Sequence, residues 1–272
     1  MTPGACLLYV DPSPRGEWAL AMAALLPRAA VSSWTLLATA EDLEQDPQLL
    51  ARAAARLPAA GAPVHEARLP GPAEAAVVRE ASARPYELVV VPPAGRNAVQ
   101  RMLRGSRVAT VVRRVPSSVL VARRPPVRIE RVLAAASGRP RSRAVIRAAV
   151  WLASAWGAQA TVLHVAPEVA LPFQPQGGAA GAGAVDPPDL AADVIRRELG
   201  EAAAEVPVIV QEGLVADQVL EEVENGAYHL LAVGGPTPGG APWAEDVVER
   251  ILVHCPTSVL VVRPGLDAAG GG

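Results

Sequence analysis

The sequence contains no lysine and few aromatic residues. All 25 basic residues are arginines, and Phe, Trp and Tyr make up only 3% of the 272 residues. Hydrophobic residues still reach 51%, so Ala, Val and Leu must build the core. This composition is typical of helices packed on sheets and argues against a disordered chain.

Cysteines and long apolar runs are also scarce. Cys6 and Cys255 are far apart and belong to no CxxC pair or Cys/His cluster, so we predict two buried thiols in a reducing cytosol and no zinc site. No stretch approaches the roughly 20 apolar residues of a membrane helix, and the N-terminal MTPGACLLYVDPS lacks the basic region of a signal peptide. We therefore expect a cytoplasmic protein with no membrane partner.

Charge is distributed unevenly along the chain. Residues 1–126 carry 15 arginines against 10 acids, a net charge of +5, and residues 127–272 carry 10 arginines against 17 acids, a net charge of −7. Between Glu87 and Glu130 there are nine arginines and no acid. A positive field favours an anionic ligand in the first half, although a solvated helix face and a basic linker explain the count equally well. We expect no nucleic-acid partner.

The two halves of the sequence follow the same pattern, which indicates an internal duplication. CLLYVDPSPRGEWALAMAALLPRAAVSSWTLLATA near the start and RVLAAASGRPRSRAVIRAAVWLASAWGAQATVLHVA past the middle both read as strand, turn, Ala-rich helix and strand. Later, ELVVVPP corresponds to HLLAVGG, and RRVPSSVLVAR corresponds to VHCPTSVLVVR. The proline-containing RRPPVR joins the copies. We predict two domains, 1–126 and 127–272, below called the first and second halves.

Each half alternates apolar strands with helices, which predicts right-handed βαβ units. The fold class is α/β, with two tandem three-layer α/β/α sandwiches, each a five-stranded parallel sheet of order 3-2-1-4-5. Strands are expected at 5–10, 34–38, 64–69, 87–91 and 118–123, then at 131–136, 160–165, 206–211, 229–233 and 257–263. We expect one helix at 47–57, another at 98–113, a mobile loop at 167–189 and a flexible C-terminal tail.

A ligand site is expected where the first and fourth strands of the first half end, because the winding direction reverses there. Asp11 ends the first strand, and PPAGRNAVQRMLRGS, Pro92–Ser106, follows the fourth. The Asp11 carboxylate could accept hydrogen bonds from an adenine amino group or a ribose hydroxyl. Alternatively, Asp11 only caps the helix that follows it.

The loop after the fourth strand has features of a phosphate site. Gly95 permits close approach, Gly105 and Ser106 offer backbone N–H groups and a hydroxyl, and Arg107 follows them. Loop geometry alone would also account for the glycines. The residue types therefore leave both readings open.

Three motifs resemble those of the universal stress proteins. VDPS (residues 10–13) resembles their V-D-G-S, Gly95 followed by nine residues and Gly105-Ser106 resembles G-x2-G-x9-G-[ST], and PSSVLVAR resembles P-C-P-V-L-V-V. Residues 5–263 thus resemble a tandem universal stress protein with two degenerate copies. The resemblance implies that Asp11 and Thr39 contact adenine, and that Pro92, Gly95, Gly105 and Ser106 surround ribose and phosphates. It implies ATP, or another adenine nucleotide, in the first half only.

Departures from the family pattern weaken this implication. Pro92 replaces the first glycine of the phosphate motif and Pro93 follows it, which removes two N–H donors. In the second half, Ser137 replaces the aspartate, and Glu245-Asp246 stands where Gly-Ser would be. Two carboxylates repel a triphosphate, so we expect this half to bind no nucleotide.

Two further expectations concern assembly and function. Fifth strands are apolar edges that universal stress proteins pair in dimers, so we expect the halves to pair them about a pseudo-twofold axis, giving either a monomer with an internal pseudo-dimer or a homodimer. The sequence has no GxxxxGK[ST], GxSxG or HExxH motif, so we expect a regulatory protein rather than an enzyme, with slow nucleotide hydrolysis left open. The alternative is a scaffold that binds an unknown protein partner and no nucleotide.

Overall fold

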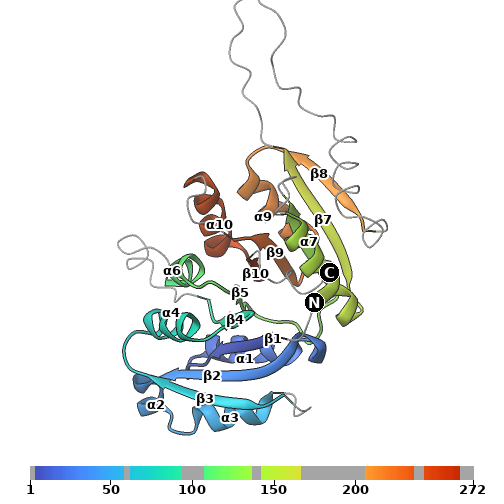
Figure 1. Cartoon of the computed structure of the whole chain (residues 1–272). Helices are drawn as coiled ribbons and strands as arrows, with labels where there is room; N and C mark the ends of the chain where they lie inside the picture. The colour runs from blue at the N-terminus through green and yellow to red at the C-terminus, as the bar shows by residue number, and fades with distance from the viewer. Residues whose placement is uncertain are drawn as a thin grey trace, which may run out of the picture.

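A ten-stranded sheet runs through both halves of the chain (Figure 1). The computed structural model describes residues 4–57, 62–93, 107–136, 142–166, 206–235 and 242–263. The strand order is β3-β2-β1-β4-β5-β10-β9-β6-β7-β8. Each half therefore has the predicted order 3-2-1-4-5, and the fifth strands meet in the middle.

The first half contributes five strands and six helical segments to the described structure. Its strands are β1 (Gly4–Tyr9), β2 (Val31–Thr39), β3 (Val64–Leu69), β4 (Leu88–Val91) and β5 (Ser118–Val121). Its helical segments are α1 (Pro14–Leu25), the 3₁₀ turn η1 (Arg28–Ala30), α2 (Ala40–Gln45), α3 (Leu49–Arg56), α4 (Ala73–Ala83) and α6 (Arg107–Arg114). The strands pair in parallel, as their continuous apolar runs predict.

The second half repeats this arrangement. Its strands are β6 (Arg131–Ala136), β7 (Gln159–Ala166), β8 (Val208–Glu212), β9 (Leu230–Gly234) and β10 (Ser258–Val262). Its helices within the described residues are α7 (Ser142–Trp156), α9 (Val215–Asn225) and α10 (Pro242–His254). The loop predicted at 167–189 and the C-terminal tail lie outside the described residues.

The antiparallel pair β5–β10, here called the seam, joins the two halves. Leu120 lies opposite Leu260, Val119 opposite Val261 and Val121 opposite Val259. Leu120 and Leu260 occupy equivalent positions in the two copies of the PSSVLVAR motif, so a pseudo-twofold axis passes between them. The predicted pairing of the fifth strands within one chain is confirmed, and it leaves neither apolar edge open.

Helices cover both faces of the sheet on either side of the seam, which gives three layers. On one face, α1, α3 and α7 pack over a core that includes Leu8, Leu36, Leu120 and Leu260. On the other face, α4, α6, α9 and α10 pack over residues from both halves. Because each core is continuous between the halves, they share their hydrophobic stabilisation.

A hydrogen bond between a tyrosine and a glutamate also occurs in both copies. Tyr86 donates a hydrogen bond to Glu80 over 2.9 Å, and Tyr228 donates one to Glu222 over 3.0 Å. Burial, the largest cause, raises the pKa of both tyrosines. The six-residue spacing of each Glu–Tyr pair is a trace of the duplication that extends beyond the apolar strands.

The structure corrects one helix prediction. In place of a single helix at 47–57, α2 begins directly after β2, and α3 starts at Leu49. Thr39 and Asp42 form a capping box that starts α2 at the end of the strand. The helix expected at 98–113 is described from Arg107 onward, and its earlier residues lie outside the described part of the chain.

Candidate functional site

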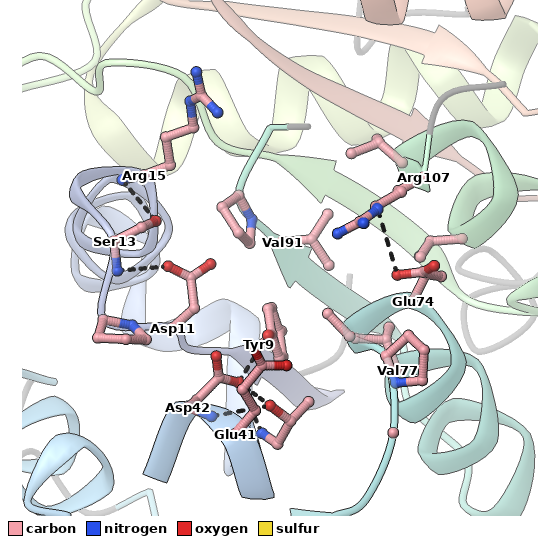
Figure 2. Close-up of a pocket in the computed structure, with 18 of the residues that line it drawn as sticks. Tyr9, Asp11, Ser13, Arg15, Glu41, Asp42, Glu74, Val77, Val91 and Arg107 are labelled. Atoms are coloured by element: carbon pink, nitrogen blue, oxygen red, sulfur yellow. Dashed lines mark hydrogen bonds and ion pairs between the residues drawn. The ribbon is translucent and has the colours of Figure 1, made fainter. Parts of the chain in front are cut away.

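A cavity of about 900 Å³ lies at the carboxyl ends of β1, β2 and β4 (Figure 2). Loops and helix ends from α1, α2, α4 and α6 complete its walls. It lies where the chain's direction of winding reverses between β1 and β4, which is the usual ligand position in such sheets. Its volume falls within the range of small-molecule sites.

Four of the seven predicted site residues line this cavity. Asp11, Thr39, Pro92 and Arg107 come from four different segments and meet around it. Gly95, Gly105 and Ser106 lie outside the described residues. The fold therefore brings these four residues together at one edge of the sheet, as the strand order predicts. That any of the seven residues contacts a ligand stays a prediction.

Asp11 shapes the turn into α1. Its Oδ1 accepts a hydrogen bond from the backbone N–H of Ser13 over 2.8 Å. Ser13, not Asp11, caps α1, because its hydroxyl accepts from the N–H groups of Arg15 and Gly16 at 3.2 Å each. The alternative of Asp11 as the helix cap is thus wrong. A Cβ on Gly16 would lie 2.1 Å from the Asp11 carbonyl oxygen, so the tight turn requires glycine here.

Thr39 is held by a neighbouring acid. Its hydroxyl donates to Asp42 Oδ2 over 2.6 Å, and its backbone N–H donates to the same oxygen over 2.9 Å. The Tyr9 hydroxyl also donates to that oxygen, over 2.8 Å. Burial, together with this hydrogen bond, raises the pKa of Tyr9. The hydroxyl oxygen of Thr39 accepts from the Asp42 backbone N–H over 3.2 Å. Both donors of Thr39 are therefore occupied, and one lone pair of its hydroxyl oxygen remains for an adenine ring.

Two prolines follow β4 on the adjacent wall. Val91 ends the strand and still accepts a bond from the backbone of Ala122 at 2.9 Å. Pro92 and Pro93 come next, and both line the cavity. Neither has a backbone N–H, so the described residues after β4 supply none of the amide donors that usually bind phosphate oxygens.

Carboxylates outnumber cations on the described walls. The cavity is lined by two arginines and five acids, which are Asp11, Glu41, Asp42, Glu44 and Glu74. Sequence reasoning missed the acids of α2 and α4. The Thr-x-x-Asp spacing in TAED was a signal for α2, whereas nothing in the sequence placed α4 against the cavity.

Glu74 and Arg107 face each other across the cavity from Asp11 (Figure 2). Their closest charged atoms, Glu74 Oε2 and Arg107 Nε, are 3.9 Å apart, which allows an ion pair but no hydrogen bond. Glu74 Oε2 is buried and accepts no hydrogen bond from the described residues. Arg107 is mostly exposed, so its guanidinium remains available to an anionic ligand.

The corresponding edge of the second half is built differently. Val165, at the position of Thr39, is a buried apolar residue. His164 Nδ1 lies 3.0 Å from the carbonyl oxygen of Ala136 and so bridges the ends of β6 and β7. Ser137 and the side chain of Glu245 lie outside the described residues. The described part of this edge thus lacks a hydroxyl corresponding to Thr39.

The described residues form neither a metal-binding cluster nor a helix that could span a membrane. Within the six described ranges, no three His, Cys, Asp or Glu side chains cluster in a way that could hold a metal ion. No helix in the part of the chain that the structure describes is long and apolar enough to cross a bilayer.

Comparison with known proteins identifies the family. No curated protein sequence matches the chain. The structure resembles a universal stress protein from Archaeoglobus fulgidus DSM 4304, with a TM-score of 0.71, 17% identity and 98% of each chain covered. It also resembles a functionally unknown protein from Pseudomonas aeruginosa PAO1, with a TM-score of 0.65, 15% identity and coverage of 97% of this chain and 94% of that one. The universal stress protein family model matches residues 6–123 and again 128–263. The chain therefore belongs to the universal stress protein family, with one family unit in each half.

Proposed function

We propose that this chain is a cytoplasmic regulatory protein of the universal stress type whose first half binds ATP or another adenine nucleotide. Its output would be a conformational change or a contact with a protein partner, and not catalysis. The observation that carries this proposal is the cavity of about 900 Å³ at the β1/β4 switch point, with Asp11 on one wall and Arg107 on the opposite one.

The two walls suit the two ends of a nucleotide. The Asp11 carboxylate, held by Ser13, can accept from an adenine amino group or a ribose hydroxyl. Val91, from the end of β4, gives apolar surface against which a base can pack. The exposed guanidinium of Arg107 can pair with a phosphate.

A binding role without catalysis is supported by the residue types. Among the described residues that line the cavity, none is His, Cys or Lys, and these types most often act as bases or nucleophiles in enzymes. The Tyr9 hydroxyl donates to Asp42, and its raised pKa keeps it protonated, so it is not available as a base. The free, buried Cys6 and Cys255 fit a reducing compartment.

Titration calorimetry on the full chain with adenosine, AMP, ADP and ATP tests the proposal. Asp11→Asn keeps the oxygen that accepts from Ser13 but replaces the other oxygen with a donor. It should weaken binding about tenfold, because a mispaired polar group loses roughly 1–3 kcal/mol. Asp246→Asn, at an exposed acid on α10 of the second half, is the matched control and should leave affinity unchanged. If none of the four compounds binds at millimolar concentration, the proposal is wrong.

A second candidate is a scaffold that contacts a protein partner and binds no nucleotide. It is favoured by the five carboxylates of the cavity and by Pro92 and Pro93, which together disfavour a triphosphate. The same calorimetry separates the candidates. Binding of any adenine compound that Asp11→Asn weakens supports the first candidate, and absence of binding by all four supports the scaffold.

A further inference from the structure

Helix α6 belongs both to the candidate site and to the junction between the halves. Near its start, Arg107, Val108 and Val111 line the cavity. Its other end approaches α10 of the second half, and the two helices lie side by side (Figure 1). A displacement of α6 would therefore move one wall of the cavity.

The second half holds the C-terminal end of α6. Arg263, directly after β10, donates from its guanidinium to the carbonyl oxygen of Val112 and, over 3.3 Å, to that of Arg113. Its backbone N–H donates to Ser118 Oγ over 3.1 Å. On α10, Glu249 forms an ion pair with Arg113 at 3.0 Å. The last carbonyls of a helix have no partner within it and form its negative end, so a cation there stabilises the helix.

We propose that Arg263 is a positioning residue for the candidate site, so that the second half supports the wall of a cavity that lies in the first half. This inference rests on the proposed nucleotide binding. It gives the second half a role in ligand binding although that half lacks the site residues itself. Arg263 touches no ligand and acts through α6, which carries Arg107 on the cavity wall.

The pseudo-twofold axis provides a matched control. Arg123, the equivalent residue in the first half, donates to the carbonyl oxygen of Leu252 near the end of α10, and its N–H donates to Ser258 Oγ over 3.0 Å. None of the described residues that line the cavity comes from α10. Arg123→Met and Arg263→Met thus remove equivalent cap contacts, but only Arg263→Met loosens a cavity wall.

The experiment compares the two variants in the full chain by three measurements. These are AMP and ATP affinity by calorimetry, hydrogen exchange of residues 107–114 without ligand, and the urea midpoint. We expect Arg263→Met to weaken affinity about fivefold to tenfold, within the range for loss of a charged helix cap, and to speed exchange in α6. Arg123→Met should change affinity less than about twofold. Both variants should lower the urea midpoint by about the same amount, because each loses an equivalent cap contact. Arg263→Lys, which keeps the charge, should restore part of the affinity.

Two results would overturn the inference. One is unchanged affinity and unchanged α6 exchange in Arg263→Met, and the other is an equal loss of affinity in both variants, which would indicate general destabilisation. If wild type binds none of adenosine, AMP, ADP and ATP, the proposed function fails and the site role of Arg263 fails with it. Faster α6 exchange in Arg263→Met alone would then still show that Arg263 holds the helix.

Discussion

Replacing Leu260 by alanine at the centre of the seam tests whether the two halves fold as one unit. Leu260 and its cross-strand partner Leu120 are 4% and 1% exposed. Both line an existing apolar void of about 20 Å³, together with Leu26, Leu152 and Trp156. Removing three carbon atoms costs about 2.4 kcal/mol at ~0.8 kcal/mol each. The remaining cavity adds a further 1–2 kcal/mol at ~24 cal/mol per Å³.

The expected loss is therefore about 3–5 kcal/mol of unfolding free energy for Leu260→Ala. Leu120→Ala should cost a similar amount, because the pseudo-twofold axis gives it equivalent surroundings. The double variant should lose less than the sum, since the two residues share one cavity. Leu214→Ala is the matched control; that side chain is 68% exposed and should change stability by no more than about 0.5 kcal/mol.

Urea unfolding gives the magnitude, and hydrogen exchange of α3 and α9 reports each half separately. Because the sheet and both cores cross the seam, Leu260→Ala should destabilise α3 in the first half as much as α9 in the second. Two separate transitions, with only the second half affected, would refute the single folding unit. A loss below about 1 kcal/mol would refute the packing argument.

Three other predictions address the cavity and the buried thiols. Asp42→Asn should lower the urea-unfolding free energy by about 1–3 kcal/mol, because its carboxylate oxygen accepts three hydrogen bonds; an unchanged midpoint would contradict this. Glu74→Gln should strengthen ATP binding about twofold to fivefold in calorimetry, since it removes a carboxylate beside Arg107; weaker binding would show that the ion pair positions the arginine. Burial raises the pKa of Cys6 to about 12 and that of Cys255 to about 11, from 9.0. As the pH rises, the thiols lose their protons in the unfolded chain before they do so in the folded one. The free energy of unfolding should therefore fall above about pH 9, by ~1.4 kcal/mol per pH unit for each thiol. Urea midpoints at pH 8 and at about pH 10 measure this fall, and it should be shallower in a Cys6→Ala/Cys255→Ala variant.

Much of the sheet could be predicted because its signal is local. The strand predicted at 64–69 was found at Val64–Leu69, and the one predicted at 131–136 at Arg131–Ala136. Continuous apolar runs such as Leu88–Val91 are buried on both faces of the sheet and admit few other structures. The repeat predicted that both halves share one strand order, and the resemblance to universal stress proteins predicted the pairing of β5 with β10.

The site was less predictable because its walls come from distant segments. Motif matching and topology together placed Asp11, Thr39, Pro92 and Arg107 at one sheet edge, and all four line the cavity. They did not reveal that Asp42 occupies both donors of Thr39. These two hydrogen bonds form because α2 begins directly after Thr39, the last residue of β2, where the capping box starts the helix.

The sequence alone determined the duplication and the α/β class, since these follow from short apolar runs, their spacing and the repeat. The sheet edge predicted for the candidate site followed from an assumed strand order and from the resemblance to universal stress proteins. Tertiary structure decided the character of the site and how it is held. It brought the acids of α2 and α4 to the cavity and placed Arg263 on the end of α6. Such contacts join residues up to 151 positions apart in the sequence. They arise only when packing brings those segments together, so no local pattern could predict them.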